Sequence, residues 1–137
     1  MPMIARWPGK VPAGRVSDQV WAFWDILPTA AQIAGADVPP GLDGISMLPA
    51  LLDREQQDHE YLYWEFYERG FQQAVRKNNW KAVRLGQDKP VELYNLEIDS
   101  GETTDIAGQH PGLTDEMSGI MKDCHSEADI SWFREQK

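Results

Sequence analysis

The feature that most constrains the fold is a helical segment with almost no polar surface. Residues 25–35 read D-I-L-P-T-A-A-Q-I-A-G. Asp25 is predicted to cap the start of this helix by accepting from first-turn amides, and Gly35 to end it in the left-handed conformation. The polar residues Asp25, Thr29 and Gln32 form one narrow stripe at i, i+4, i+7. Such a helix is expected to be buried on most sides, so the chain is expected to be part of something larger.

Short elements flank this helix on both sides. Apolar, turn-forming and capping residues predict, in order, a strand at 3–5, a turn at 7–10, a loop at 36–44 and a short helix at 47–52 capped by Ser46. Charged residues dominate 53–60, which is expected to be an exposed connection between the two halves of the chain.

From residue 61 onward the pattern changes to one typical of strands. Runs of alternating, aromatic or β-branched residues predict strands at 61–67, 71–76, 81–85 and 91–96. The second and third runs flank Asn78 and Asn79, and asparagine tolerates the positive φ of a tight hairpin. The expected sheet is antiparallel, with Tyr61, Tyr63, Glu65 and Tyr67 on one face of its first strand.

Residues 111–124 carry the period of an amphipathic helix. The apolar positions recur at i, i+4, i+7, i+8 and i+11, which is one helical face: Leu113, Met117, Ile120, Met121 and Cys124. One amphipathic helix across an antiparallel sheet is a common α+β unit.

Composition limits the partners that the chain can have. A net charge of −9 repels phosphates, which argues against a nucleic acid or an anionic membrane. The sequence contains no apolar run near the ~20 residues that a membrane-spanning helix needs. Residues 1–10 lack the apolar core of a secretory signal, so the compartment is left open.

The sequence shows no catalytic constellation. His59, His110 and His125 have no histidine or cysteine at metal-ligand spacing, apart from Cys124, whose side chain would point away from that of His125. The acidic segment 97–105 lacks the ordered ligand pattern of a calcium loop. We therefore assign no catalytic, cofactor-binding or metal-binding residue.

Five segments resemble, in the same order, motifs of sulfatases. They are P-M-I-A-R-W-P-G at 2–9, D-I-L-P-T at 25–29, L-D-G-I-S at 42–46, A-V-R with W-K at 74–81, and E-L-Y-N-L at 92–96. Their joint order across residues 2–122 is specific. The chain resembles the C-terminal portion of an arylsulfatase-type sulfatase.

The resemblance implies an alkaline-phosphatase-like fold of α/β to α+β class. Residues 1–52 would be the tail end of a large α/β domain (strand, loop, buried helix, short helix), and residues 53–137 a small antiparallel sheet of about four strands covered by a C-terminal helix. In the family, a Cys or Ser in C/S-x-P-x-R becomes the formylglycine nucleophile, and a calcium ion polarises the sulfate. This sequence lacks those motifs, so calcium and formylglycine are expected only in the N-terminal part of the parent protein.

Two functions are open from the sequence. The first is a C-terminal fragment of a sulfatase, a sulfuric ester hydrolase, that is inactive alone. Its partner would be the missing N-terminal sulfatase domain, or a second copy bound through residues 1–52. The second is an independent module that holds a glycan or a protein on its aromatic sheet face. Family members are often periplasmic, secreted or lysosomal.

Overall fold

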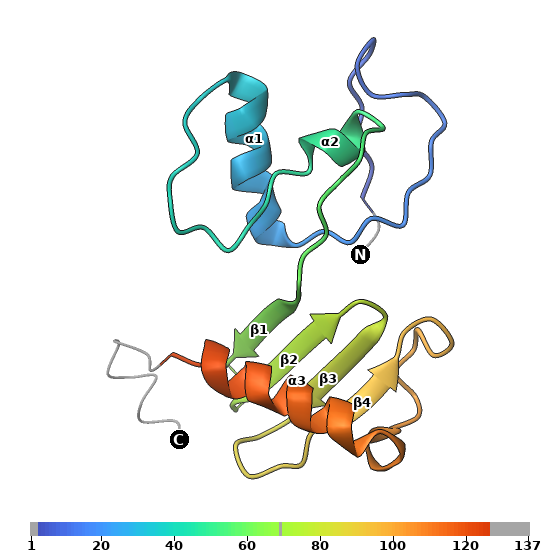
Figure 1. Ribbon diagram of the computed structural model, residues 1–137, viewed down its shortest axis with the longest axis vertical. Coiled ribbons are helices and arrows are strands. Elements are labelled where there is room, and N and C mark those ends of the chain that lie inside the picture. Colours follow the sequence, from blue (N-terminus) through green and yellow to red (C-terminus); the bar gives the residue numbers. More distant parts are fainter. Residues whose placement is uncertain (1–2, 69, 127–137) are drawn as a thin grey trace. The chain divides into compact units, whose positions relative to one another are not determined.

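The computed structural model describes residues 3–68 and 70–126 and divides into two compact units, Met1–His59 and Glu60–Lys137 (Figure 1). The end of the predicted C-terminal subdomain, residues 127–137, lies outside the described residues. The elements in chain order are η1 (Phe23–Asp25), α1 (Ile26–Ala34), α2 (Leu48–Leu51), β1 (Leu62–Phe66), β2 (Gln72–Lys77), β3 (Trp80–Arg84), β4 (Glu92–Asn95), η2 (Ala107–Gln109) and α3 (Pro111–Cys124).

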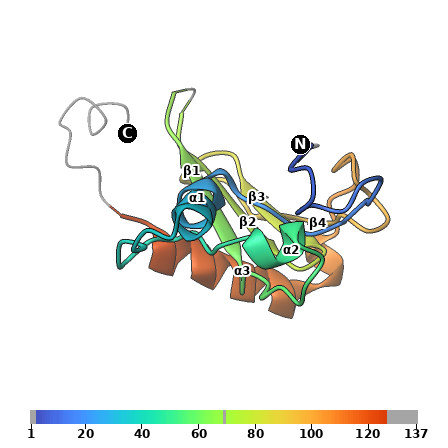
Figure 2. The same ribbon diagram turned by 90° about the horizontal axis from the view of Figure 1, so that it is seen from above.

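The second unit is a four-stranded antiparallel sheet with α3 laid along one face (Figures 1 and 2). The strand order β1-β2-β3-β4 follows the sequence, because each strand is joined to its neighbour by a short connection. Asn78, at the turn between β2 and β3, has φ 53°, the conformation that the hairpin prediction required. The predicted sheet and the helix predicted at 111–124 are both confirmed.

The core of the second unit lies between the sheet and α3. Val75, Ala82 and Leu93 are paired across β2, β3 and β4, and their side chains meet Met117 and Met121 of α3. All five residues are buried. The i, i+4 spacing of the two methionines places both on the face that α3 turns to the sheet.

A polar network also joins α3 to the sheet. The Gln73 amide is buried and donates from Nε2 to the Tyr63 hydroxyl at 2.8 Å and to the Met121 carbonyl at 3.1 Å. Its Oε1 accepts from Arg84, whose other terminal nitrogen donates to Ser118 Oγ at 2.9 Å. Because buried polar groups are costly when unpaired, these bonds favour one placement of α3 on the sheet.

The first unit is built around α1. As predicted, the helix ends at Gly35, which has φ 67°. At its start the turn η1 continues directly into α1, and Asp25 is the N-cap residue of α1, as predicted. The Asp25 carboxylate makes no capping bond to α1 and instead turns back to accept from the Ala22 amide at 2.7 Å. The position of the N-cap was therefore predicted correctly, whereas the predicted bond from the first-turn amides to the Asp25 carboxylate is not made.

The strand predicted at 3–5 does not form. These residues lack a backbone ladder, and Ile4 is exposed. A strand exists only beside a partner strand, and the described part of this unit contains none.

Two smaller predictions in the first unit are confirmed. The turn at 7–10 is closed by the Lys10 and Val11 amides, which both donate to the Trp7 carbonyl. The short helix predicted at 47–52 forms as α2, Leu48–Leu51, but its N-cap is Met47 rather than the predicted Ser46, whose hydroxyl accepts from the Leu48 amide at 3.3 Å.

Candidate interaction surface

Each histidine considered from the sequence has a different neighbour in the structure. His110 lies against Trp80, with ring centroids 5.1 Å apart, and Cys124 contacts the Tyr61 hydroxyl at 3.5 Å. Among residues 3–68 and 70–126, no three His, Cys, Asp or Glu side chains are close enough together to hold a metal ion.

The acidic segment 97–105 uses its carboxylates to shape turns. Asp99 accepts from the Thr103 and Thr104 amides, and these bonds hold the pKa of its carboxyl below the ordinary value. Asp105 accepts from the amides of Leu93 and Ala107. These contacts tie the segment to the edge of β4.

Acidic side chains also bond the tyrosines of the sheet. His125 Nδ1 and the Tyr67 hydroxyl both contact Glu65 Oε1 at 2.8 Å. Burial, followed by a hydrogen bond with Glu65, raises the pKa of Tyr63 above its usual value. A hydrogen bond to Glu92 raises the pKa of Tyr94 to about 12. These contacts give Glu65 and Glu92 structural partners.

A second polar arrangement lies on α1. The three polar residues of the helix face the segment 45–47, and each bonds to one of its residues. We name these contacts the polar clasp: Asp25 with the Ile45 amide (3.0 Å), Thr29 Oγ1 with the Met47 amide (2.9 Å) and Gln32 Oε1 with the Ser46 hydroxyl. The clasp requires Gly44, because a Cβ there would lie 2.2 Å from the Trp24 carbonyl oxygen.

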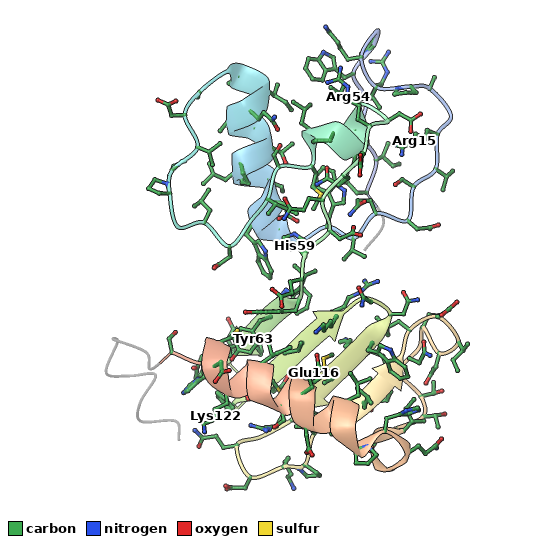
Figure 3. The ribbon with its side chains drawn as sticks, viewed as in Figure 1. Arg15, Arg54, His59, Tyr63, Glu116 and Lys122 are labelled. Carbon is green, nitrogen blue, oxygen red and sulfur yellow. The ribbon has the colours of Figure 1, made fainter. Side chains whose placement is uncertain are left out.

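His59 completes the clasp from the end of the first unit (Figure 3). Its Nε2–H donates to both carboxylate oxygens of Asp25 at 3.0 Å. The Asp25 side chain is 0% exposed and that of His59 only 9%, so the carboxylate is satisfied entirely by protein donors. Sequence reasoning missed this pair, because no local pattern links residues 34 positions apart.

The clasp leaves the apolar side of α1 exposed. We name this surface the α1 stripe: Phe23 (83% exposed), Ile26 (50%), Leu27 (53%), Ala30, Ile33 (44%) and Ala34. These residues recur at i, i+3, i+4, i+7, i+10 and i+11, which is one continuous helical face. Within this chain the helix is therefore not buried on most sides, in keeping with the expectation that the chain is part of something larger.

The α1 stripe is also uncharged. Asp25 is the only charged residue between positions 19 and 36, and it is buried. Covering one exposed Leu or Ile side chain contributes roughly 1.5–3 kcal/mol. A contiguous, uncharged apolar face of this kind is typical of an interaction site, which makes the stripe the best candidate functional surface of the described residues.

Comparison with known proteins places this architecture among the sulfatases. The solved structure of Ps i-CgsB matches 96% of this chain at 29% identity, with a TM-score of 0.75. The structure of BT1596, described as a 2-O GAG sulfatase, matches 72% at 30% identity, with a TM-score of 0.62. These neighbours confirm the predicted fold class, an antiparallel sheet and helix from the C-terminal portion of an alkaline-phosphatase-like sulfatase.

The family itself is also shown by sequence. Residues 1–127 match the family described as N-sulphoglucosamine sulphohydrolase, C-terminal, and the chain belongs to this family. The N-acetylgalactosamine-6-sulfatase of Canis lupus familiaris is 37% identical over 90 residues, which are 64% of this chain and 15% of that protein. The chain likewise spans 28% of Ps i-CgsB and 23% of BT1596, so it corresponds to less than a third of each relative.

None of the helices in the described residues combines the length and apolar character needed to cross a membrane.

Proposed function

We propose that this chain functions as the C-terminal part of a sulfatase, a sulfuric ester hydrolase whose nucleophile and metal ligands lie in a separate N-terminal part. The observation that carries this proposal is the family match over residues 1–127, together with relatives of which the chain covers less than a third. The chain would supply structure to the complete enzyme rather than catalytic groups. Its sequence lacks C/S-x-P-x-R, the family's nucleophile motif.

The coding sequence upstream of Met1 tests this proposal directly. An in-frame extension that carries C/S-x-P-x-R would support a sulfatase parent. A stop codon and a promoter immediately upstream would contradict it and favour an independent module.

The isolated chain is predicted to hydrolyse aryl sulfates no faster than background, with or without calcium or a formylglycine-generating enzyme. The physical reason is that the sequence lacks the nucleophile motif and that residues 3–68 and 70–126 contain no group of three His, Cys, Asp or Glu side chains able to hold a metal ion. Release of the phenol from an aryl sulfate, followed by absorbance, measures this. Turnover that disappears in Cys124→Ala would contradict the prediction, because it would locate the activity in this chain rather than in a contaminant.

The alternative function is a glycan- or protein-binding module. One observation favours it: Trp64 and Phe66 are exposed and lie on the opposite face of β1 from Tyr63, which packs against the core beneath α3. Aromatic side chains on an open sheet face can stack on sugars or contact an apolar peptide. Calorimetric titration with sulfated and unsulfated oligosaccharides, carried out on the wild-type chain and on Trp64→Ala, tests this alternative. It requires that the wild-type chain binds an oligosaccharide and that Trp64→Ala binds it more weakly.

A further inference from the structure

We propose that residues 53–59 are a conformational device, a strap that closes the first unit and is locked by the buried bond from His59 to Asp25. Release of this lock turns the short junction at 60–61, just before β1, into a longer tether at 53–61. The proposed function makes no use of this link, so either proposal can fail without the other.

The strap lies on the first unit, although its composition is that of an exposed connection (Figure 3). Its backbone is fixed where the Arg54 amide donates to the Pro49 carbonyl at 2.9 Å. The Gln56 side chain bridges two groups at α2, because its Oε1 accepts from the Ala50 amide and its Nε2 donates to the Ser46 carbonyl, both at 3.1 Å. Gln56 thereby pairs a first-turn amide of α2, a group that has no acceptor within its own helix.

Polar contacts hold the strap. Its sequence, D-R-E-Q-Q-D-H, contains no apolar side chain, so burial of apolar surface does not anchor it. At the surface, Asp53 pairs with Arg15 Nε at 2.9 Å. Asp58 Oδ1 accepts from Gln19 Nε2 at 2.8 Å, also at the surface. Exposed contacts of this kind contribute little to stability, and a segment that depends on them opens locally at low cost.

His59 makes the strongest contact of the strap and is therefore its lock. Its Nε2–H donates to both carboxylate oxygens of Asp25, and the two side chains are 9% and 0% exposed. A hydrogen bond to a charged acceptor is roughly twice as strong as one between neutral groups. Once His59 leaves, water can replace it at the carboxylate, while the amides of Ala22 and Ile45 still donate to Asp25. Opening of the strap is therefore expected to leave α1 in place.

The lock also sets how far the second unit can move from the first. While the strap is closed, only residues 60–61 link His59 to β1, and an extended chain of that length reaches roughly 7 Å. With the strap open, residues 53–61 form the link, and its reach rises to roughly 30 Å. One side-chain contact thus switches the chain between a tight junction and a long tether.

Trypsin cleavage after Arg54 measures the opening, since Arg54 and Glu55 are exposed residues within the strap. Under native conditions such cleavage follows the population of the open form. His59→Ala is expected to be cut at least about ten-fold faster than the wild-type chain, because the strap loses its only charge-assisted buried bond. Asp58→Ala is the matched control: it removes a neighbouring but exposed strap contact and should be cut within about two-fold of the wild-type rate. His59→Gln keeps an N–H donor and should restore part of the protection.

Spin labels test the tether. Asp37→Cys and Asp88→Cys place one label at an exposed site in each unit, and Cys124→Ser removes the native thiol. Double electron–electron resonance then measures the distribution of distances between the two labels. This distribution is expected to be broader in His59→Ala than in the wild-type background, whereas Asp58→Ala should leave it unchanged.

Three results would overturn the proposal. Equal cleavage after Arg54 in the wild-type chain, His59→Ala and Asp58→Ala would show that His59 is not the lock. An unchanged distance distribution in His59→Ala would show that no tether is released. Loss of the hydrogen-exchange protection of α1 in His59→Ala would show that the first unit unfolds instead of opening its strap. None of these results bears on the upstream coding sequence, which tests the proposed function.

Discussion

Replacing Met117 by aspartate is expected to destabilise the second unit by about 3–5 kcal/mol, the cost of a buried charge without a partner. Met117 is fully buried, and the buried cluster around it consists of Val75, Ala82, Leu93 and Met121. A carboxylate there would lose its water and gain no donor. Because small domains have only about 5–15 kcal/mol of stability, thermal melting followed by circular dichroism should show a large fall in the midpoint.

Two variants calibrate this result. Met117→Leu keeps the volume and the apolar character and should cost less than about 1.5 kcal/mol. Ile120→Asp should cost less than Met117→Asp, because Ile120 is only partly buried at the rim of the core. If Met117→Asp had the same melting temperature as the wild-type protein, α3 would not pack on the sheet as described.

The sheet and α3 could be predicted because their signals are local. Alternation every second residue identifies strands, and the i, i+4 spacing of Met117 and Met121 identifies the buried face of a helix. The Asn78–Asn79 turn then fixes which strands pair. Each of these patterns lies within about a dozen residues of sequence. The observed strands, the helix α3 and the residues of the core match the patterns.

The partners of the polar side chains of α1 could not be predicted, because they lie far away in the sequence. An apolar helix with one narrow polar stripe is expected to turn its apolar side inward. Here the amides of Ile45 and Met47 donate to the polar residues Asp25 and Thr29. His59, which lies 34 positions from Asp25 in the sequence, donates to the Asp25 carboxylate. These bonds pair the buried polar groups of the helix, while its apolar side stays exposed within this unit.

The clasp also gives a physical reason for two of the motifs on which the family resemblance rested. D-I-L-P-T supplies Asp25 and Thr29, and L-D-G-I-S supplies Gly44, the Ile45 amide and Ser46. The two motifs bond to each other, and Gly44 stands where any Cβ would strike the Trp24 carbonyl. Motif matching therefore found the right residues, although the sequence alone indicated a cap at Asp25 rather than this contact.

Asp25→Ala is expected to destabilise the first unit by about 3–5 kcal/mol, since it removes one partner from a buried charged network. The Ala22 and Ile45 amides and the His59 Nε2–H would all lose their acceptor. Amide hydrogen exchange is the suitable measurement, because it reports on α1 separately from the sheet. The amides of α1 should lose protection, whereas those of β2 and β3 should keep it.

Asp37→Ala is the matched control for this variant, because Asp37 is exposed just beyond the same helix. It should change stability by no more than about 0.5 kcal/mol. The loss of stability in Asp25→Asn should lie between those of Asp25→Ala and Asp37→Ala. Asparagine retains one acceptor oxygen but places an amide group against N–H donors. Unchanged protection of α1 in Asp25→Ala would mean that the clasp does not hold the helix, and the outward presentation of the α1 stripe would then need another cause.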